Sequence, residues 1–199
     1  MIMKKNHKIK ACLFFAVLAM GVLGIGKMVS EHIKNNLKDN VIRFHVRANS
    51  DSKKDQTDKL KVRDAVIEYM GPYMEQAQSK EKAVKILEEQ KEEIKKTAIH
   101  TLRNLGNNSQ VNVYFTTEVF PEKDYGQYCF PEGIYDAIRI DIGKAKGHNW
   151  WCVMFPDLCI TKDDKVKVNQ KAKDKMERIL GERTVKAIEK NKYLRWFIN

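Results

Sequence analysis

The chain has 199 residues, with 37 Lys or Arg against 26 Asp or Glu, which gives a formal net charge of +11. This length can bury the core of one domain and is short for two. The basic surplus favours anionic envelope surfaces such as lipid headgroups or wall polymers. Nucleic acid is not an expected partner, because the sequence carries no motif of a known nucleic-acid-binding module.

Residues 1–30 are typical of a signal peptide or an N-terminal membrane anchor. A lysine-rich start is followed by an uninterrupted apolar run from Ala11 to Gly26, which ends at Lys27. The run is slightly shorter than the roughly 20 residues that span a bilayer, and it lacks a clear small-residue cleavage site, so a cleaved signal and a retained anchor are both open. In either case the positive-inside bias places the following residues outside the cytoplasm.

Residues 40–199 are expected to form one exported domain, and its first element is a strand. Apolar and basic side chains alternate along this strand: Ile42, Phe44 and Val46 against Arg43, His45 and Arg47. Because successive side chains of a strand point to opposite faces, the alternation predicts a half-buried strand with a basic row exposed to solvent.

Two helices are expected after this strand. Ser52 and Asp55 resemble a capping box, and apolar residues then recur at helical spacing for about five turns, with a break or kink at residues 71–72, a Gly-Pro pair. Ser79 can cap the second helix, and Gly106 is its expected stop.

Strand patterns dominate the middle of the chain. Residues 111–115 and 134–143 alternate with a period of two, residues 150–155 are a third candidate strand, and helical spacing returns before Gly181. The order of one strand, two helices, several strands and a last helix predicts an α+β domain. Its sheet is expected to be antiparallel or mixed and to be covered by helices on one face.

Two stretches of the sequence carry a specific combination of residues. They are RFHVRANSDSKKDQTDKLKVRDAV, which begins at Arg43, and GKAKGHNWWCVMFPDLC, which ends at Cys159. Together they resemble the two most characteristic blocks of the stage II sporulation protein R family of endospore-forming Firmicutes, over about Val41 to Cys159. Asp157 stands where the family pattern has a second proline, which weakens the expectation of a rigid turn there. The residues that carry the resemblance are Arg43, His45, Asn49, Ser50, Asp51, Asp55, Gln56, Lys59, Arg63, Asn149, Trp150, Trp151 and Cys152.

The resemblance implies a signalling protein of sporulation. Such a protein is made in the forespore and exported to the space between the two sporulation membranes, either secreted or held by its N-terminal segment, where it can also touch a membrane surface. It is expected to activate, by binding, a membrane-embedded aspartic protease that processes the pro-form of the early mother-cell sigma factor. The family supplies no catalytic residue and no cofactor, so the chain is not expected to be an enzyme.

Three cysteines, Cys129, Cys152 and Cys159, lie in the expected exported domain. Outside the cytoplasm, three cysteines are expected to form one disulfide and to leave one thiol. The alternative is that they are buried thiols without a bridge, and both are open. No metal site is expected, because the histidines show no H-x-x-x-H and the cysteines no C-x-x-C spacing.

Two surfaces are candidates for the receptor contact. The first is the polar edge of the first strand and the turn after it, since arginine suits a partner's carboxylates: Arg43, His45, Arg47, Asn49 and Asp51. The competing interpretation is that the turn only caps the helix and the basic row only faces water. Trp150 and Trp151 form the second surface if one of them is exposed, whereas burial on both faces is the other interpretation.

The alternative function is an envelope hydrolase. It would use Cys152 with His45, or the region of His45 and Asp51, as a nucleophile and base.

Overall fold

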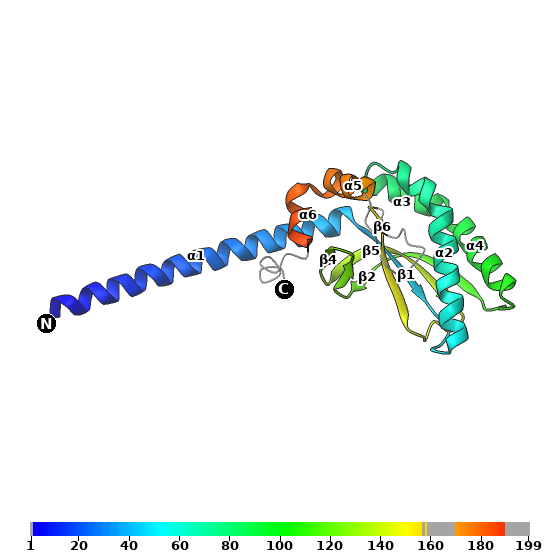
Figure 1. Ribbon diagram of the computed structural model, residues 1–199, viewed down its shortest axis with the longest axis horizontal. Coiled ribbons are helices and arrows are strands. Elements are labelled where there is room, and N and C mark those ends of the chain that lie inside the picture. The colour runs from blue at the N-terminus through cyan, green and yellow to red at the C-terminus, as the bar shows by residue number, and fades with distance from the viewer. Residues whose placement is uncertain (1, 157, 159–169, 190–199) are drawn as a thin grey trace.

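One long helix leads into an α+β domain (Figure 1). The computed structural model describes residues 2–156, 158 and 170–189. It confirms the predicted fold class, a mixed sheet with helices after an N-terminal apolar helix. The elements follow the chain as α1 (Ile2–Asn40), β1 (Ile42–Arg47), α2 (Lys53–Gln76), α3 (Lys80–Glu89), α4 (Lys91–Asn104), β2 (Val111–Phe120), β3 (Lys123–Tyr125), β4 (Tyr128–Phe130), β5 (Gly133–Ile142), β6 (Asn149–Phe155), α5 (Gln170–Leu180) and α6 (Glu182–Ile188).

The helix α1 changes character along its 39 residues. Large apolar side chains between Leu13 and Val29 are exposed, whereas Ile33 and Leu37 are buried against the domain. The stretch Leu13–Asn40 is long and apolar enough to cross a membrane, a test that signal sequences also pass. Both predicted forms of the N-terminal segment, signal and anchor, are compatible with this helix.

The main sheet has four strands in the order β2-β5-β1-β6. β1 pairs in parallel with β5 and antiparallel with β6, while β2 pairs antiparallel with β5. Since β1 and β5 run in the same direction, their carboxyl ends meet at one edge of the sheet, next to the amino end of β6. This edge brings together segments that are about 95 residues apart in sequence, as the bond between Lys144 N and Asn49 Oδ1 shows.

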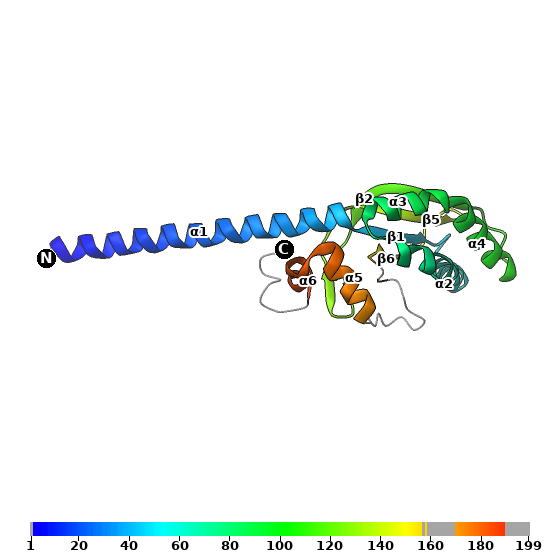
Figure 2. The same ribbon diagram turned by 90° about the horizontal axis from the view of Figure 1, so that it is seen from above.

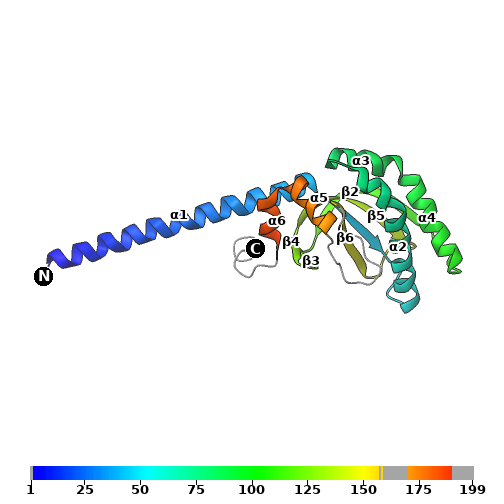
Figure 3. The same ribbon diagram turned by 45° about the horizontal axis from the view of Figure 1, so that its top comes forward.

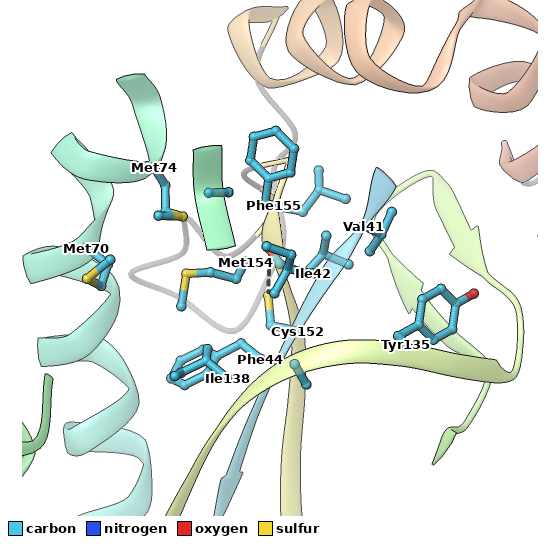
Figure 4. Close-up of a cluster of buried hydrophobic side chains, with 14 of the residues drawn as sticks. Val41, Ile42, Phe44, Met70, Met74, Tyr135, Ile138, Cys152, Met154 and Phe155 are labelled. Carbon is cyan, nitrogen blue, oxygen red and sulfur yellow. Dashed lines mark hydrogen bonds between the residues drawn. The ribbon is translucent and has the colours of Figure 1, made fainter. Parts of the chain in front are cut away.

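One face of the sheet packs on the helices and forms the core shown in Figure 4. Phe44 of β1 lies in register with Ile138 of β5 and with Cys152 of β6. Met70 and Met74 of α2 contribute to the same buried cluster. The apolar half of the predicted alternation in β1 is therefore confirmed.

The other half of that prediction is wrong, because β1 is buried on both faces. A short hairpin of β3 and β4 covers the face that was expected to meet solvent, and Tyr125, Tyr128 and Phe130 of the hairpin are buried. Strands of three residues give no readable period, so the sequence did not predict this cover.

Most helix ends lie where the capping signals predict them. Ser52 and Ser79 each accept a hydrogen bond from a backbone N–H of the first turn, and Gly106 has the positive φ of +68° that suits a helix stop. Two details differ. α2 continues through residues 71–72 to Gln76 instead of breaking there, and the predicted second helix is two helices that meet at Gln90.

Replacing Pro72 with alanine should stabilise the domain. Pro72 lies inside α2, where it removes a backbone hydrogen bond, and it is exposed, so no packing is lost with the ring. We expect the free energy of unfolding to rise by about 1 kcal/mol, because part of the helical gain is offset by a more flexible unfolded chain. Urea unfolding of the full chain in a neutral detergent, followed by circular dichroism, measures this change. A lower urea midpoint would contradict it.

The helices α5 and α6 pack beside α1, at the end of the domain from which α1 projects (Figures 2 and 3). Their apolar side chains Met176, Leu180 and Ile188 are buried. α5 ends just before Gly181, as the sequence predicts. The opposite end of the domain, where α2 begins and α4 ends, is free of these elements (Figure 1).

Candidate functional site

Arg43 is fully buried between β1 and the β3–β4 hairpin. Its Nε donates to the carbonyl oxygen of Cys152 at 3.2 Å, and its Nη2 donates to the hydroxyl of Tyr125 at 3.1 Å. Four aromatic rings surround the guanidinium carbon, with centroids at these distances: Phe120 4.6 Å, Tyr135 5.1 Å, Tyr125 5.7 Å and Phe130 5.8 Å. The prediction that Arg43 is exposed for a partner is therefore wrong, because rings from β2, β5 and the hairpin enclose its guanidinium.

His45 is also buried, with 2% of its surface exposed. Its ring stacks on Trp151 at a centroid distance of 3.8 Å, and its Nδ1 lies 3.4 Å from Oε2 of Glu118. Burial lowers the pKa of His45 to about 4, so the ring is neutral at pH 7. The prediction of an exposed, basic His45 is therefore wrong, because Trp151 and Phe120 cover its ring and burial keeps it neutral.

Lowering the pH from 7 to 4 should destabilise the domain through His45. The unfolded histidine keeps a pKa near 6.5, so between pH 6.5 and 4 the unfolded state binds a proton that the folded state excludes. We expect a loss on the order of 2–3 kcal/mol in the free energy of unfolding. A His45→Phe variant keeps a stacked ring without titrating. The difference between the two pH profiles isolates His45, and parallel profiles would contradict the prediction.

Arg47 is the one member of the predicted basic row that stays partly exposed. Its Nε and Nη2 donate to the two carboxylate oxygens of Asp141 at 2.6 and 2.5 Å. This paired hydrogen bond raises the pKa of Arg47. Arg139 lies on the other side of Asp141, with Nε to Oδ1 at 3.4 Å. The charge of Arg47 is thus already engaged within the sheet.

The turn after β1 and the loop before β6 form a polar cluster, which we call the distal tip (residues 49–56 and 143–149). Asn49 Nδ2 and Ser50 Oγ both donate to Oδ2 of Asp55, at 2.9 and 2.5 Å. These bonds lower the pKa of Asp55, which therefore stays ionised at neutral pH. Part of the capping interpretation is thus correct, because Asn49 and Ser50 hold the first-turn carboxylate of α2.

Asp51 ties the two halves of the distal tip together. Its Oδ1 accepts hydrogen bonds from the backbone N–H of His148 at 2.6 Å and contacts His148 Nδ1 at 2.5 Å. These contacts lower the pKa of Asp51. Lys59 adds a buried support, since its Nζ donates to the carbonyl of His148 at 2.9 Å and to Gln56 Oε1 at 2.6 Å.

Two glycines allow the halves of the tip to touch. Gly143 has a positive φ of +57°, and a Cβ there would lie 2.3 Å from Asn49 Oδ1. A Cβ on Gly147 would lie 2.2 Å from the backbone oxygen of Ser50. Because the contact at Gly147 is with backbone, the loop has no room for a larger residue.

Trp150 and Trp151 point to opposite faces of β6, and both are half-buried. Trp150 packs edge-on against Phe44 at 5.7 Å, with the Arg63 guanidinium 5.0 Å from its ring. Trp151 packs on His45. Both rings therefore support the two faces of the sheet, and a partner contact through either one stays a prediction.

Cys152 is disulfide-bonded in the structure, on the helix-covered face of β6. Cys159, the partner considered for it, lies outside the described residues, and Cys129 is buried on β4. His45 faces the other side of the sheet from Cys152, so the structure does not bring together a cysteine nucleophile and that base. Among the described side chains, no group of three or more His, Cys, Asp or Glu could hold a metal ion.

The sequence signals for the distal tip were partial. Ser52 was recognisable as a cap, whereas the bond from Lys59 to the carbonyl of His148 was not, because it depends on how β1 and β5 pair. The two glycines of GKAKG are the signal in the sequence that could mark this close approach.

The geometry can be compared with known proteins. Residues 38–165, which include all strands of the described residues, match the family Stage II sporulation protein R (spore_II_R). The chain is also 34% identical over 187 residues to Stage II sporulation protein R of Bacillus subtilis (strain 168), across 88% of this chain and 84% of that protein. No solved structure gives a significant match. The chain therefore belongs to the stage II sporulation protein R family.

Proposed function

We propose that this protein is exported from the forespore and activates, by binding, a membrane-embedded aspartic protease that processes the pro-form of the early mother-cell sigma factor. The observation that carries the proposal is family membership along nearly the whole chain, with 34% identity to a named sporulation protein. The further steps, export, receptor and sigma-factor processing, are those that the family resemblance implies.

The arrangement of α1 supports export. Its exposed apolar part ends near Val29, and the next turns bury Ser30, Ile33 and Leu37 in the domain. A chain inserted by this helix carries its domain directly against the membrane surface, outside the cytoplasm by the positive-inside bias. Secretion after cleavage and anchoring through α1 both fit the proposal.

The polar groups of the domain support action by binding and not by catalysis. Arg43 and His45 are occupied by aromatic packing, Arg47 by Asp141, and Asp51 by His148. Arg43 and His45 hold the sheet from inside, while Arg47 and Asp51 are tied down at its surface, and a rigid surface suits recognition because little ordering is needed when a partner binds.

Reconstitution in a foreign host tests the proposal. The exported full chain is co-expressed with the protease and its pro-sigma substrate, in a host that lacks all other sporulation proteins, and processing is followed by immunoblot. Processing should require both the chain and its export, so a variant without residues 2–27 should be inactive although it folds in the cytosol. Equal processing without the chain, or with the cytosolic variant, would overturn the proposal.

A further inference from the structure

The distal tip lies at the end of the domain that is farthest from the exposed part of α1 (Figures 1 and 3). β1 leaves the end of α1 and runs away from it, and the tip begins two residues after β1 ends. From Val29 to Asn40 a helix advances ~16 Å, and from Ile42 to Asn49 a strand advances ~23 Å, so the tip can stand up to ~40 Å from the apolar segment. A surface in this position points away from the membrane that holds the chain.

The tip is exposed, yet backbone hydrogen bonds join its two halves. Lys146 N donates to Asn49 O at 3.3 Å, and Gly147 N donates to Ala48 O at 3.0 Å. Side chains of Asn49, Asp51 and Gln56 add bonds from one half of the tip to the other or within it. Such a network in a surface loop fixes the backbone from which the exposed side chains project.

The side chains that this scaffold carries outward are mostly basic. Lys53, Lys144 and Lys146 are exposed, and none of them forms an ion pair within the part of the chain that the structure describes. The two carboxylates of the tip are already engaged, Asp55 by Asn49 and Ser50 and Asp51 by His148. The tip therefore presents three lysines without a direct ion-pair partner among the described residues, next to two ionised carboxylates whose oxygens are held by hydrogen bonds within the tip.

We propose that the distal tip is a docking surface for an acidic segment of the partner protein, a proposal that rests on the function proposed above. Charge complementarity favours carboxylates, because fixed lysines gain most from an oppositely charged partner that is also ordered. A lipid surface is a poorer fit, since sequence elements that bind anionic membranes usually cluster four to eight basic residues. The tip has four lysines, but Lys54 is paired with Asp58, and the other three are interleaved with hydrogen-bonding groups such as His148 and Asn149.

Charge reversal of the tip tests the proposal. The variant K53E/K144E/K146E is compared with K82E/K85E/K123E, which changes the net charge by the same amount at exposed lysines outside the tip. Each full-length chain is co-purified with the membrane-embedded protease in a neutral detergent. We expect the tip variant to retain at most a tenth of the amount of protease that the wild-type chain retains, and the control variant at least half of that amount. Thermal unfolding should be unchanged in both.

The outcomes separate the tip from the proposed function. If the wild-type chain neither retains the protease nor activates it, the proposed function fails. If the wild-type chain and the tip variant retain the protease equally well, the docking proposal is overturned while the proposed function stands. A loss that appears only after phosphatidylglycerol is added to the detergent also overturns the proposal, because it assigns the tip to a lipid surface.

Discussion

Replacing Arg43 with alanine should lower the free energy of unfolding by about 3–5 kcal/mol, the range for emptying a large, fully buried site. The change removes the cation from four aromatic rings and leaves a cavity between β1 and the β3–β4 hairpin. It also leaves the carbonyl of Cys152 and the hydroxyl of Tyr125 without their donor. Buried groups that lose a partner add a desolvation cost to the loss of packing.

Two further variants separate the contributions of volume and charge at Arg43. Arg43→Met fills most of the volume without a cation, so it should recover about half of the loss. Arg103→Ala, at an exposed position on α4, should change stability by less than about 0.5 kcal/mol. Urea unfolding of the full chain in neutral detergent, followed by tryptophan fluorescence, gives the three values. An Arg43→Ala variant within 1 kcal/mol of wild type would show that the hairpin does not depend on the cation.

Replacing Gly147 with alanine should cost about 3 kcal/mol of stability, in line with overpacking of a tight site. The new Cβ would lie 2.2 Å from the backbone oxygen of Ser50 and 2.5 Å from its carbonyl carbon. The loop can relieve this contact only by moving away, which breaks the hydrogen bond from Gly147 N to Ala48 O and strains those of Asp51.

A neighbouring substitution is the control for Gly147. Lys146→Ala shortens an exposed side chain in the same loop and should leave stability within about 0.5 kcal/mol. Hydrogen exchange adds a local readout, because the amide of His148 donates to Asp51 and should exchange faster only in the Gly147→Ala variant. Unchanged exchange at His148 would refute the close packing of the tip.

Local patterns predicted much of the fold. The caps at Ser52 and Ser79 and the strand at residues 150–155 could be read because each signal lies within a few residues. The prediction of an exposed basic row was wrong because Arg43 is covered by residues between Phe120 and Tyr135, about 80 positions away, and part of this cover lies in strands too short for a pattern. Period-two alternation shows that a strand has an apolar face and a polar face, but it does not show whether another element packs on the polar face.

The candidate site was predictable only in part. The residues of the turn after β1 were identified from the sequence, but their contact with the loop before β6 follows from the parallel pairing of β1 with β5. No local signal fixes such a pairing, since it depends on the whole order of the sheet. The exposed lysines form a candidate surface because Asp51 and Asp55 bond to His148 and Ser50 within the tip and, among the described residues, form no ion pair with these lysines, and this pairing cannot be read from the sequence.

The unbroken course of α1 has a consequence for processing by a signal peptidase. Such enzymes cut an extended backbone, whereas the residues around Gly26 are helical and the same helix continues into Ile33 and Leu37, which are locked in the core. Because the C-terminal part of α1 is buried in the domain, unwinding the helix near Gly26 requires part of the free energy of local unfolding. Removal of the segment therefore competes in time with folding of the domain. A chain that folds first therefore keeps α1, which under the function proposed above would hold it at the membrane into which it was inserted.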